Sequence, residues 1–141
     1  MEGLVQKDLT KSIAVSNCTI PLMIDMLAGC QIKPAVNQIE CNPYMSQADV
    51  LRFHRKWGVT IEAYSSIGAE GSKLHEDLAM RELAEAKGCS VAQLAIAWAI
   101  KRGTVALVKT VKIERLAENI GAAQIELSDD EAEKIDGLNK N

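Results

Sequence analysis

A hydroxyl group and two cations gather where the last of four short β-rich segments gives way to a helix. Lys109 and Thr110 follow the strand expected at residues 105–108, and Arg115 lies in the first turn of the helix expected next. Backbone N–H groups, a hydroxyl and two fixed cations near a helix N-terminus favour a bound anion, most simply a phosphate. A solvated cluster of basic side chains is the other interpretation that these residue types allow.

The other three β-rich segments also carry polar side chains at or near their ends. Ser16 and Asn17 end the first segment, where they either bind a ligand or cap the following helix. Because side chains alternate along a strand, Gln38 in the second segment and Glu62 in the third each lie on the face that would point into a barrel interior. A polar group buried there is either functional or held in a network, because it needs a partner. Tyr64 ends the third segment, as a packed rim residue or a functional one.

Strand and helix signals alternate along the chain, which predicts a parallel sheet with crossover helices in the α/β class. Ser46 is the expected N-cap of the second helix, and two later helices begin with capping boxes, formed by Ser90 with Gln93 and by Ser128 with Glu131. The expected strands are 12–16, 35–40, 59–64 and 105–108, and the expected helices are 21–27, 47–57, 74–87, 91–101, 113–120 and one from Ser128 to about Gly137. Four strand–helix units make half of a (β/α)8 TIM barrel, since a whole barrel needs roughly 250 residues. We therefore expect residues 1–141 to form a single half-barrel domain.

Composition excludes several classes of function. A net charge of −3 offers no electrostatic basis for binding nucleic acid or an anionic membrane. No apolar run reaches the ~18 residues of a membrane span, and the N-terminus lacks the order of a signal peptide, so we expect a cytoplasmic protein. Neither histidine lies near a cysteine at ligand spacing, so no metal site is expected. Reduced thiols are favoured over disulfides for the four scattered cysteines, Cys18, Cys30, Cys41 and Cys89.

Four stretches of the sequence resemble consecutive blocks of the aldo-keto reductase family, in the family's order and at its spacing. They are IAVSN at 13–17, KPAVNQIECNPY at 33–44, AYSSIG at 63–68 and LVKTVKIERLAEN at 107–119. The resemblance covers essentially the whole chain and implies the C-terminal half of a TIM-barrel oxidoreductase. In that family hydride passes from NADPH to a small-molecule aldehyde or ketone while a tyrosine supplies the proton.

The resemblance implies a role for each matching residue along the cofactor. Ser16, Asn17 and Gln38 would hydrogen-bond the nicotinamide carboxamide, and Tyr64 would stack on the nicotinamide ring. Lys109, Thr110 and Arg115 would hold the adenosine 2′-phosphate, which makes NADPH the expected cofactor. The remaining matches are Ser65 and Ile67 along the pyrophosphate path, and Glu118 and Asn119 at the adenine.

The sequence departs from the family pattern in three respects. Ser66, Val108 and Ile113 stand where family members commonly have proline, so we expect looser loops and lower cofactor affinity. Glu62 stands where a neutral residue is usual and would need a partner or a raised pKa. The family's Tyr, Lys, Asp and His tetrad belongs before the point that corresponds to Met1, so no residue is expected to be catalytic.

These departures lead to one main prediction and two alternative hypotheses. We expect a truncated reductase that carries the cofactor-binding half and is inactive by itself. The rivals are a non-catalytic nucleotide-binding protein and a half-barrel scaffold that pairs with a second copy, which would cover the open edges of its outer strands.

Overall fold

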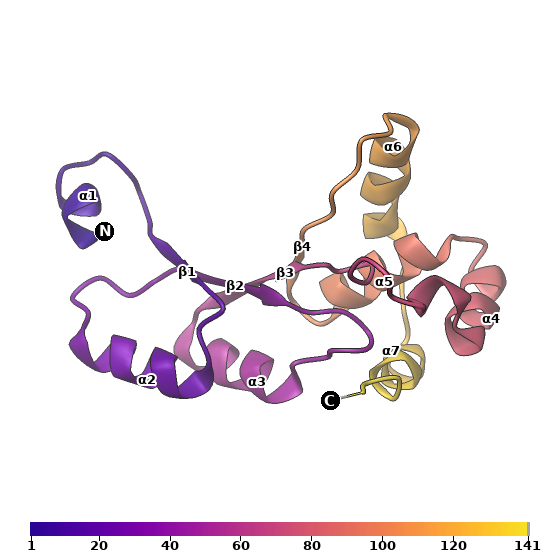
Figure 1. Cartoon of the computed structure of the whole chain (residues 1–141), viewed down its shortest axis with the longest axis horizontal. Helices are drawn as coiled ribbons and strands as arrows, with labels where there is room; N and C mark the ends of the chain where they lie inside the picture. Colours follow the sequence, from indigo (N-terminus) through magenta and orange to yellow (C-terminus); the bar gives the residue numbers. More distant parts are fainter. Residues whose placement is uncertain (141) are drawn as a thin grey trace. The chain divides into compact units, whose positions relative to one another are not determined.

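The structure is a computed structural model that describes residues 1–140. Strands and helices alternate, and the four strands lie in the order β1-β2-β3-β4, as the half-barrel prediction requires (Figure 1). The strands are β1 Ala14–Ser16, β2 Val36–Glu40, β3 Thr60–Tyr64 and β4 Val105–Ala106. The helices are α1 Glu2–Gln6, α2 Ile20–Gly29, α3 Ala48–Trp57, α4 Leu78–Ala86, α5 Val91–Lys101, α6 Glu114–Gly121 and α7 Asp129–Asp136, with short 3-10 turns η1 Leu74–Glu76 and η2 Ala122–Gln124.

The chain divides into two compact units, which are described separately below. The first unit comprises Met1–Ile39 and Gln47–Glu62, and the second comprises Glu40–Ser46 and Ala63–Asn141. The expectation of a single domain stays a prediction.

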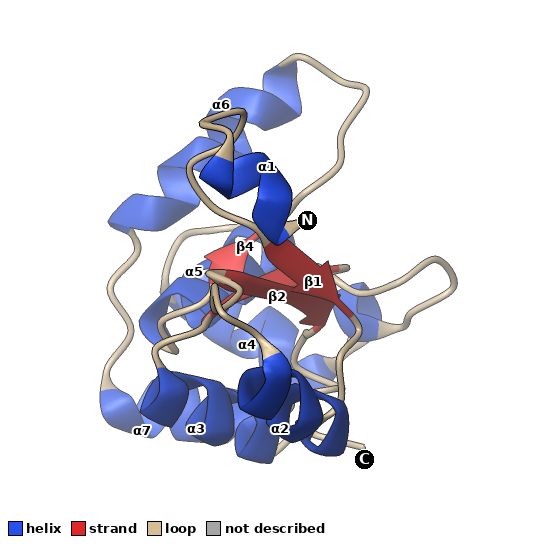
Figure 2. Ribbon diagram, turned by 90° about the vertical axis from the view of Figure 1, so that its left-hand side faces the viewer, coloured by secondary structure: helices blue, strands red, loops and turns tan. Residues whose placement is uncertain are grey.

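In the first unit, helices α2 and α3 lie on one side of β1 and β2 (Figures 1 and 2). β1 pairs with β2 in parallel, with Ser16 opposite Gln38. Along β2 the burial alternates: Asn37 and Ile39 are buried, whereas Gln38 is half-buried. The Ile39 side chain and the Asn37 amide therefore point into the core, and Gln38 lies on the opposite face of the strand, as the alternation of side chains predicts.

Asn37 and His54 form a buried polar network that fixes the loop after β1. The amide nitrogen of Asn37 lies 2.9 Å from His54 Nε2, and His54 Nδ1 lies 2.8 Å from the carbonyl of Val50. A carbonyl can only accept, so Nδ1 carries the proton and Nε2 accepts from the Asn37 amide. Asn37 also bonds both backbone groups of Cys18, at 3.3 Å and 2.9 Å. The two side chains thereby position the turn that carries Asn17.

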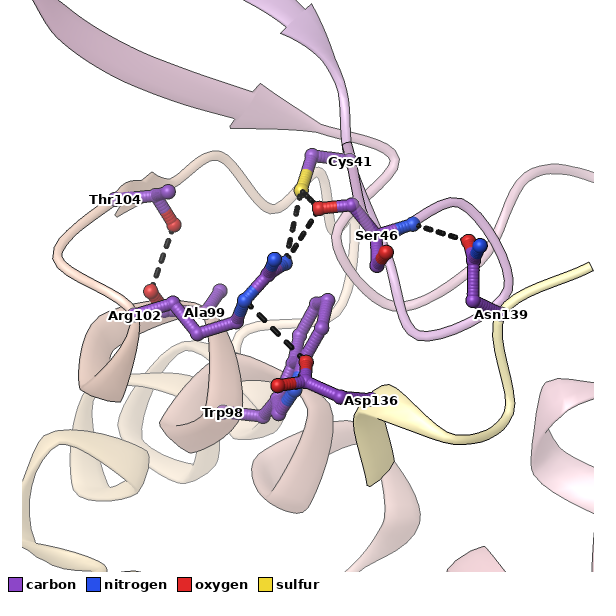
Figure 3. Close-up of polar contacts among 8 residues, drawn as sticks. All are labelled: Cys41, Ser46, Trp98, Ala99, Arg102, Thr104, Asp136 and Asn139. Atoms are coloured by element: carbon purple, nitrogen blue, oxygen red, sulfur yellow. Dashed lines mark hydrogen bonds and ion pairs between the residues drawn. The ribbon is translucent and has the colours of Figure 1, made fainter. Parts of the chain in front are cut away.

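In the second unit, Arg102 joins three segments that lie far apart in the sequence (Figure 3). Its guanidinium donates to the Ser46 carbonyl at 2.6 Å, pairs with Asp136 at 3.4 Å and lies 4.5 Å from the ring centroid of Trp98. Trp98 is fully buried, and its indole N–H donates to the same carboxylate at 3.0 Å. Burial raises the pKa of the neighbouring Cys41 thiol to about 11, although Arg102 opposes that shift. These contacts hold the loop after β2 against α5 and α7.

Three local predictions were wrong. Ser46 does not cap α3: the helix begins after Gln47, which adopts left-handed geometry with φ 53 and caps nothing with its side chain. The backbone groups of Ser46 are engaged instead by Arg102 and by the Asn139 side chain, which accepts from the Ser46 N–H at 2.8 Å. The expected helix at 74–87 is a 3-10 turn followed by α4, which Asp77 caps, and β4 ends at Ala106 rather than at residue 108.

Candidate functional site

The polar residues predicted at the first two strand ends come together within the first unit. Ser16 Oγ and the Asn17 N–H both donate to the carbonyl of Gln38, at 3.0 Å and 2.8 Å. The Gln38 side chain donates in turn to Glu62 at 2.9 Å, which supplies the partner that this carboxylate was expected to need. Asn17 has φ 53, so the chain leaves β1 through a left-handed residue that turns it sharply. The Ser16 hydroxyl, the Asn17 backbone N–H and the Gln38 amide are thus held close together.

Tyr64 is the last residue of β3, Ser65 and Ile67 follow in the loop, and the second unit contains all three. Ser65 has φ 52, a left-handed conformation that is uncommon for a residue with a side chain. Ser66 is almost completely buried, and its hydroxyl donates to the carbonyls of Ala63 and Leu107. This hydroxyl ties the end of β3 to the segment after β4, a contact that a proline at this position could not make.

A cavity of about 420 Å³ in the second unit unites most of the predicted phosphate and adenine residues. Residues from α6 and the segment before it contribute the charged side chains of the wall. Six predicted residues line it, namely Ile67, Lys109, Thr110, Arg115, Glu118 and Asn119. Four further lining residues were not predicted, namely His75, Ser90, Val91 and Ala92.

The cavity is lined by two exposed cations and one half-buried, hydrogen-bonded carboxylate. Lys109 and Arg115 are both solvent-exposed cations, as expected of side chains that meet an incoming anion. Glu118 is half-buried, and the Ser90 hydroxyl donates to its carboxylate at 2.6 Å. Thr110 Oγ1 accepts from the Lys112 N–H at 3.1 Å, which fixes the bend before α6. The cavity thus offers two exposed cations and one fixed carboxylate to a ligand that is both anionic and able to donate hydrogen bonds.

The local sequence explains why Ser90 stands at the start of α5, where it lines this cavity. It is the N-cap of α5, and it forms a full capping box with Gln93, as predicted. The Gln93 side chain also donates to the Glu118 carbonyl at 2.9 Å, so the start of α5 is bound to α6 at two points. The capping signal is visible in the sequence, whereas the bonds to Glu118 span 28 and 25 positions and leave no local trace.

Two side chains capable of acid–base chemistry are engaged in structural contacts. The Tyr44 hydroxyl donates to Asp77 at 2.7 Å, and burial followed by this hydrogen bond raises the pKa of Tyr44 to about 12. His54 is fully buried in the network with Asn37. Within residues 1–140 there is also no cluster of three or more His, Cys, Asp or Glu side chains that could hold a metal ion. None of the helices there is long and apolar enough to cross a membrane.

A sequence model described as "Aldo/keto reductase family" matches residues 1–140. The chain belongs to this family. Among curated aldo/keto reductase relatives, it is 39% identical to an aldo/keto reductase of Synechocystis sp., with 96% of this chain and 44% of the relative aligned. It is 35% identical to aldose reductase B of Dictyostelium discoideum (100% and 45% aligned) and 38% identical to a glycerol 2-dehydrogenase (NADP(+)) of Hypocrea jecorina (99% and 45%).

The chain spans about half the length of the curated relatives that it matches. A solved aldo-keto reductase from a Medee basin deep-sea metagenome library superposes with a TM-score of 0.95 at 24% identity. The match covers 99% of this chain and 52% of the solved chain. The fold is therefore that of one half of an aldo-keto reductase barrel, which confirms the fold class predicted from the four sequence blocks.

Proposed function

We propose that this chain carries the cofactor-binding half of an NADPH-dependent aldo-keto reductase. The cavity that brings Lys109, Thr110 and Arg115 together beside Glu118 carries this proposal. The glycerol 2-dehydrogenase relative is named for NADP(+), whereas a D-xylose reductase of Aspergillus niger is named for NAD(P)H. Two exposed cations favour the phosphorylated cofactor, because only that cofactor offers a second anionic group at the adenosine end.

The residues of the cavity fit the adenosine end of NADPH. Arg115 offers a planar fork of donors to the 2′-phosphate, Lys109 adds a point charge and Thr110 adds a hydroxyl. Glu118 is an acceptor held in place by Ser90, which suits the exocyclic amino group of adenine, and Asn119 lies beside it. A volume of about 420 Å³ lies within the range of small-molecule sites.

The remaining predicted residues serve the other end of the cofactor in this proposal. Ser16, Asn17 and Gln38 hold the nicotinamide carboxamide, and the bonds of Ser16 Oγ and the Asn17 N–H to the Gln38 carbonyl hold the end of β1 to β2 before a ligand arrives. Tyr64 supplies a flat face for the ring, and Ser65 and Ile67 follow the pyrophosphate. The bound cofactor supplies the hydride, and these side chains hold and orient it.

The reaction of the whole enzyme, in this proposal, is reduction of an aldehyde or ketone to an alcohol. This chain contributes binding and orientation, which make a reaction between two bound groups effectively unimolecular. A positioned acid is also required, and the engaged states of Tyr44 and His54 leave neither suited to that task. We further propose that the protein is cytoplasmic, which its four free, scattered cysteines support.

A titration with a turnover readout tests this function. The 141-residue chain should bind NADPH more tightly than NADH by ten-fold or more, because charge-assisted hydrogen bonds contribute about 1.5–3 kcal/mol each. With NADPH and a generic aldehyde together, it should oxidise no cofactor above a buffer blank. Equal affinity for the two cofactors would remove the basis for NADPH, and turnover on the order of 1 s⁻¹ would show that the chain holds a complete catalytic site.

A self-pairing scaffold is the second candidate, and the outer face of α6 favours it. Ile113, Leu116 and Ile120 are 80%, 51% and 74% exposed, and their spacing places them along one side of the helix. β1 and β4 also end the strand order, so among the described residues the outer side of each has no neighbouring strand. Light scattering at micromolar concentration should therefore give a dimer or a larger species. A monomer that unfolds cooperatively would contradict this expectation.

A further inference from the structure

His75 lines the phosphate cavity, although no resemblance pointed to it. It belongs to η1, a 3-10 turn whose first residue, Leu74, is fully buried. The buried leucine anchors the turn, so the imidazole that follows is carried on a fixed piece of backbone rather than on a loose loop. The side chain is solvent-exposed and makes no hydrogen bond or ion pair with any other residue among 1–140.

The charge balance of the cavity leaves room for a third cation. Lys109 and Arg115 against Glu118 leave one net positive charge, whereas a phosphate monoester carries up to two negative charges near neutral pH. We propose that His75 is a specificity-determining residue, whose imidazolium form is the third cation for the 2′-phosphate. This inference rests on the proposed NADPH site and names a residue and a pH dependence that the proposal lacks.

The other charged groups near His75 belong to the cavity lining, to its own turn and to α4, which packs against that turn and carries the exposed Arg81, Glu82 and Glu85. His75 shares the cavity lining with Lys109, Arg115 and Glu118, and the carboxylate of Glu118 is already bonded to Ser90. On its own turn the neighbour Glu76 is exposed to solvent. Asp77, the next residue, is engaged by the first N–H groups of α4 and by the Tyr44 hydroxyl. Among the described residues that line the cavity, His75 is the one histidine, and histidine is the residue type that most often gains or loses a proton near neutral pH.

Two titrations oppose each other as the pH falls. Protonation of His75 adds a positive charge and strengthens binding, whereas protonation of the phosphate, with a second pKa of about 6, removes a negative charge and weakens it. The titration of the free phosphate is the same in experiments with every variant of the protein. The ratio of two dissociation constants at one pH therefore isolates the histidine.

The test uses adenosine 2′,5′-bisphosphate as the probe and isothermal titration calorimetry at pH 5.5 and 8.5. His75→Gln removes the charge and keeps hydrogen-bonding capacity, and His75→Lys provides a charge at both values of pH. At pH 8.5 the parent and His75→Gln should bind equally within about two-fold. At pH 5.5 the parent should bind roughly three- to ten-fold more tightly than His75→Gln, a range set by one partly screened charge-assisted bond. His75→Lys should exceed His75→Gln by a similar factor at both values.

Adenosine 5′-monophosphate, which lacks the 2′-phosphate, is the control ligand. With it the ratio of parent to His75→Gln should stay near one at both values of pH. A ratio for the bisphosphate that does not change with pH, or a change that is equally large for the monophosphate, would overturn the assignment of His75. If the parent binds the bisphosphate at neither pH, the proposed NADPH site itself fails, and this inference fails with it.

Discussion

Arg115→Ala should weaken NADPH binding roughly ten- to a hundred-fold and leave NADH binding almost unchanged. Arg115 lines the cavity from the first turn of α6 and is exposed, so its removal takes away a phosphate partner without opening the core. NADH lacks the group that this side chain would hold, and its remaining contacts lie elsewhere along the cofactor. Titration of both cofactors against the parent and the variant measures the two changes directly.

Lys112→Ala is the matched control for that substitution. Lys112 is an exposed cation just before α6, but it does not line the cavity. Its loss changes the net charge by the same amount and should alter NADPH affinity by less than about three-fold, because exposed charges are screened by solvent and salt. Equal weakening of NADPH and NADH by Arg115→Ala would mean that Arg115 supports the fold, and a 2′-phosphate site here would be ruled out.

Arg102→Ala should lower the free energy of unfolding by about 2–4 kcal/mol. The substitution removes the donor to the Ser46 carbonyl, the partner of Asp136 and the cation over Trp98 (Figure 3). The arginine side chain is only 13% exposed, so water cannot readily replace these contacts. Urea unfolding followed by circular dichroism gives the change, provided that the transition is two-state.

Arg52→Ala is the control for the stability measurement. Arg52 pairs with Asp49 at 3.0 Å, but both side chains are 78% exposed. A surface pair of this kind contributes roughly 0–1 kcal/mol, so the midpoint of unfolding should barely move. Similar losses for Arg52→Ala and Arg102→Ala would show that the contacts of Arg102 do not hold the second unit together.

The parts of the fold that could be predicted are those specified by neighbouring residues. The capping boxes at Ser90 and Ser128 correctly located the starts of α5 and α7, because both bonds of a capping box lie within three residues. Ser46 misled the prediction because its backbone groups are engaged by Arg102 and Asn139, which lie 56 and 93 positions away. A distant partner leaves no mark on a local pattern.

In the candidate site too, the residues that are neighbours in the sequence could be predicted, and those brought in from distant segments could not. Lys109, Thr110 and Arg115 could be recognised as a group because they lie on one short stretch before and within the start of α6. His75 and Ser90 reach the same cavity from segments that precede β4, and only the tertiary fold brings them there. Asp77 is a signal that was available and missed: an aspartate followed by a helical pattern is a strong N-cap, and it places the start of α4 correctly.

The most direct test of the account is to map the binding of adenosine 2′,5′-bisphosphate onto the assigned amide spectrum of the chain. The largest chemical-shift changes are expected at residues 109–119, with smaller changes at His75 and at the start of α5, since these segments line the cavity. Adenosine 5′-monophosphate should give weaker binding and a smaller response at Lys109 and Arg115. Changes centred instead on other exposed basic residues, such as Arg52 and Lys56 of α3, would contradict the assignment of this cavity to a 2′-phosphorylated nucleotide.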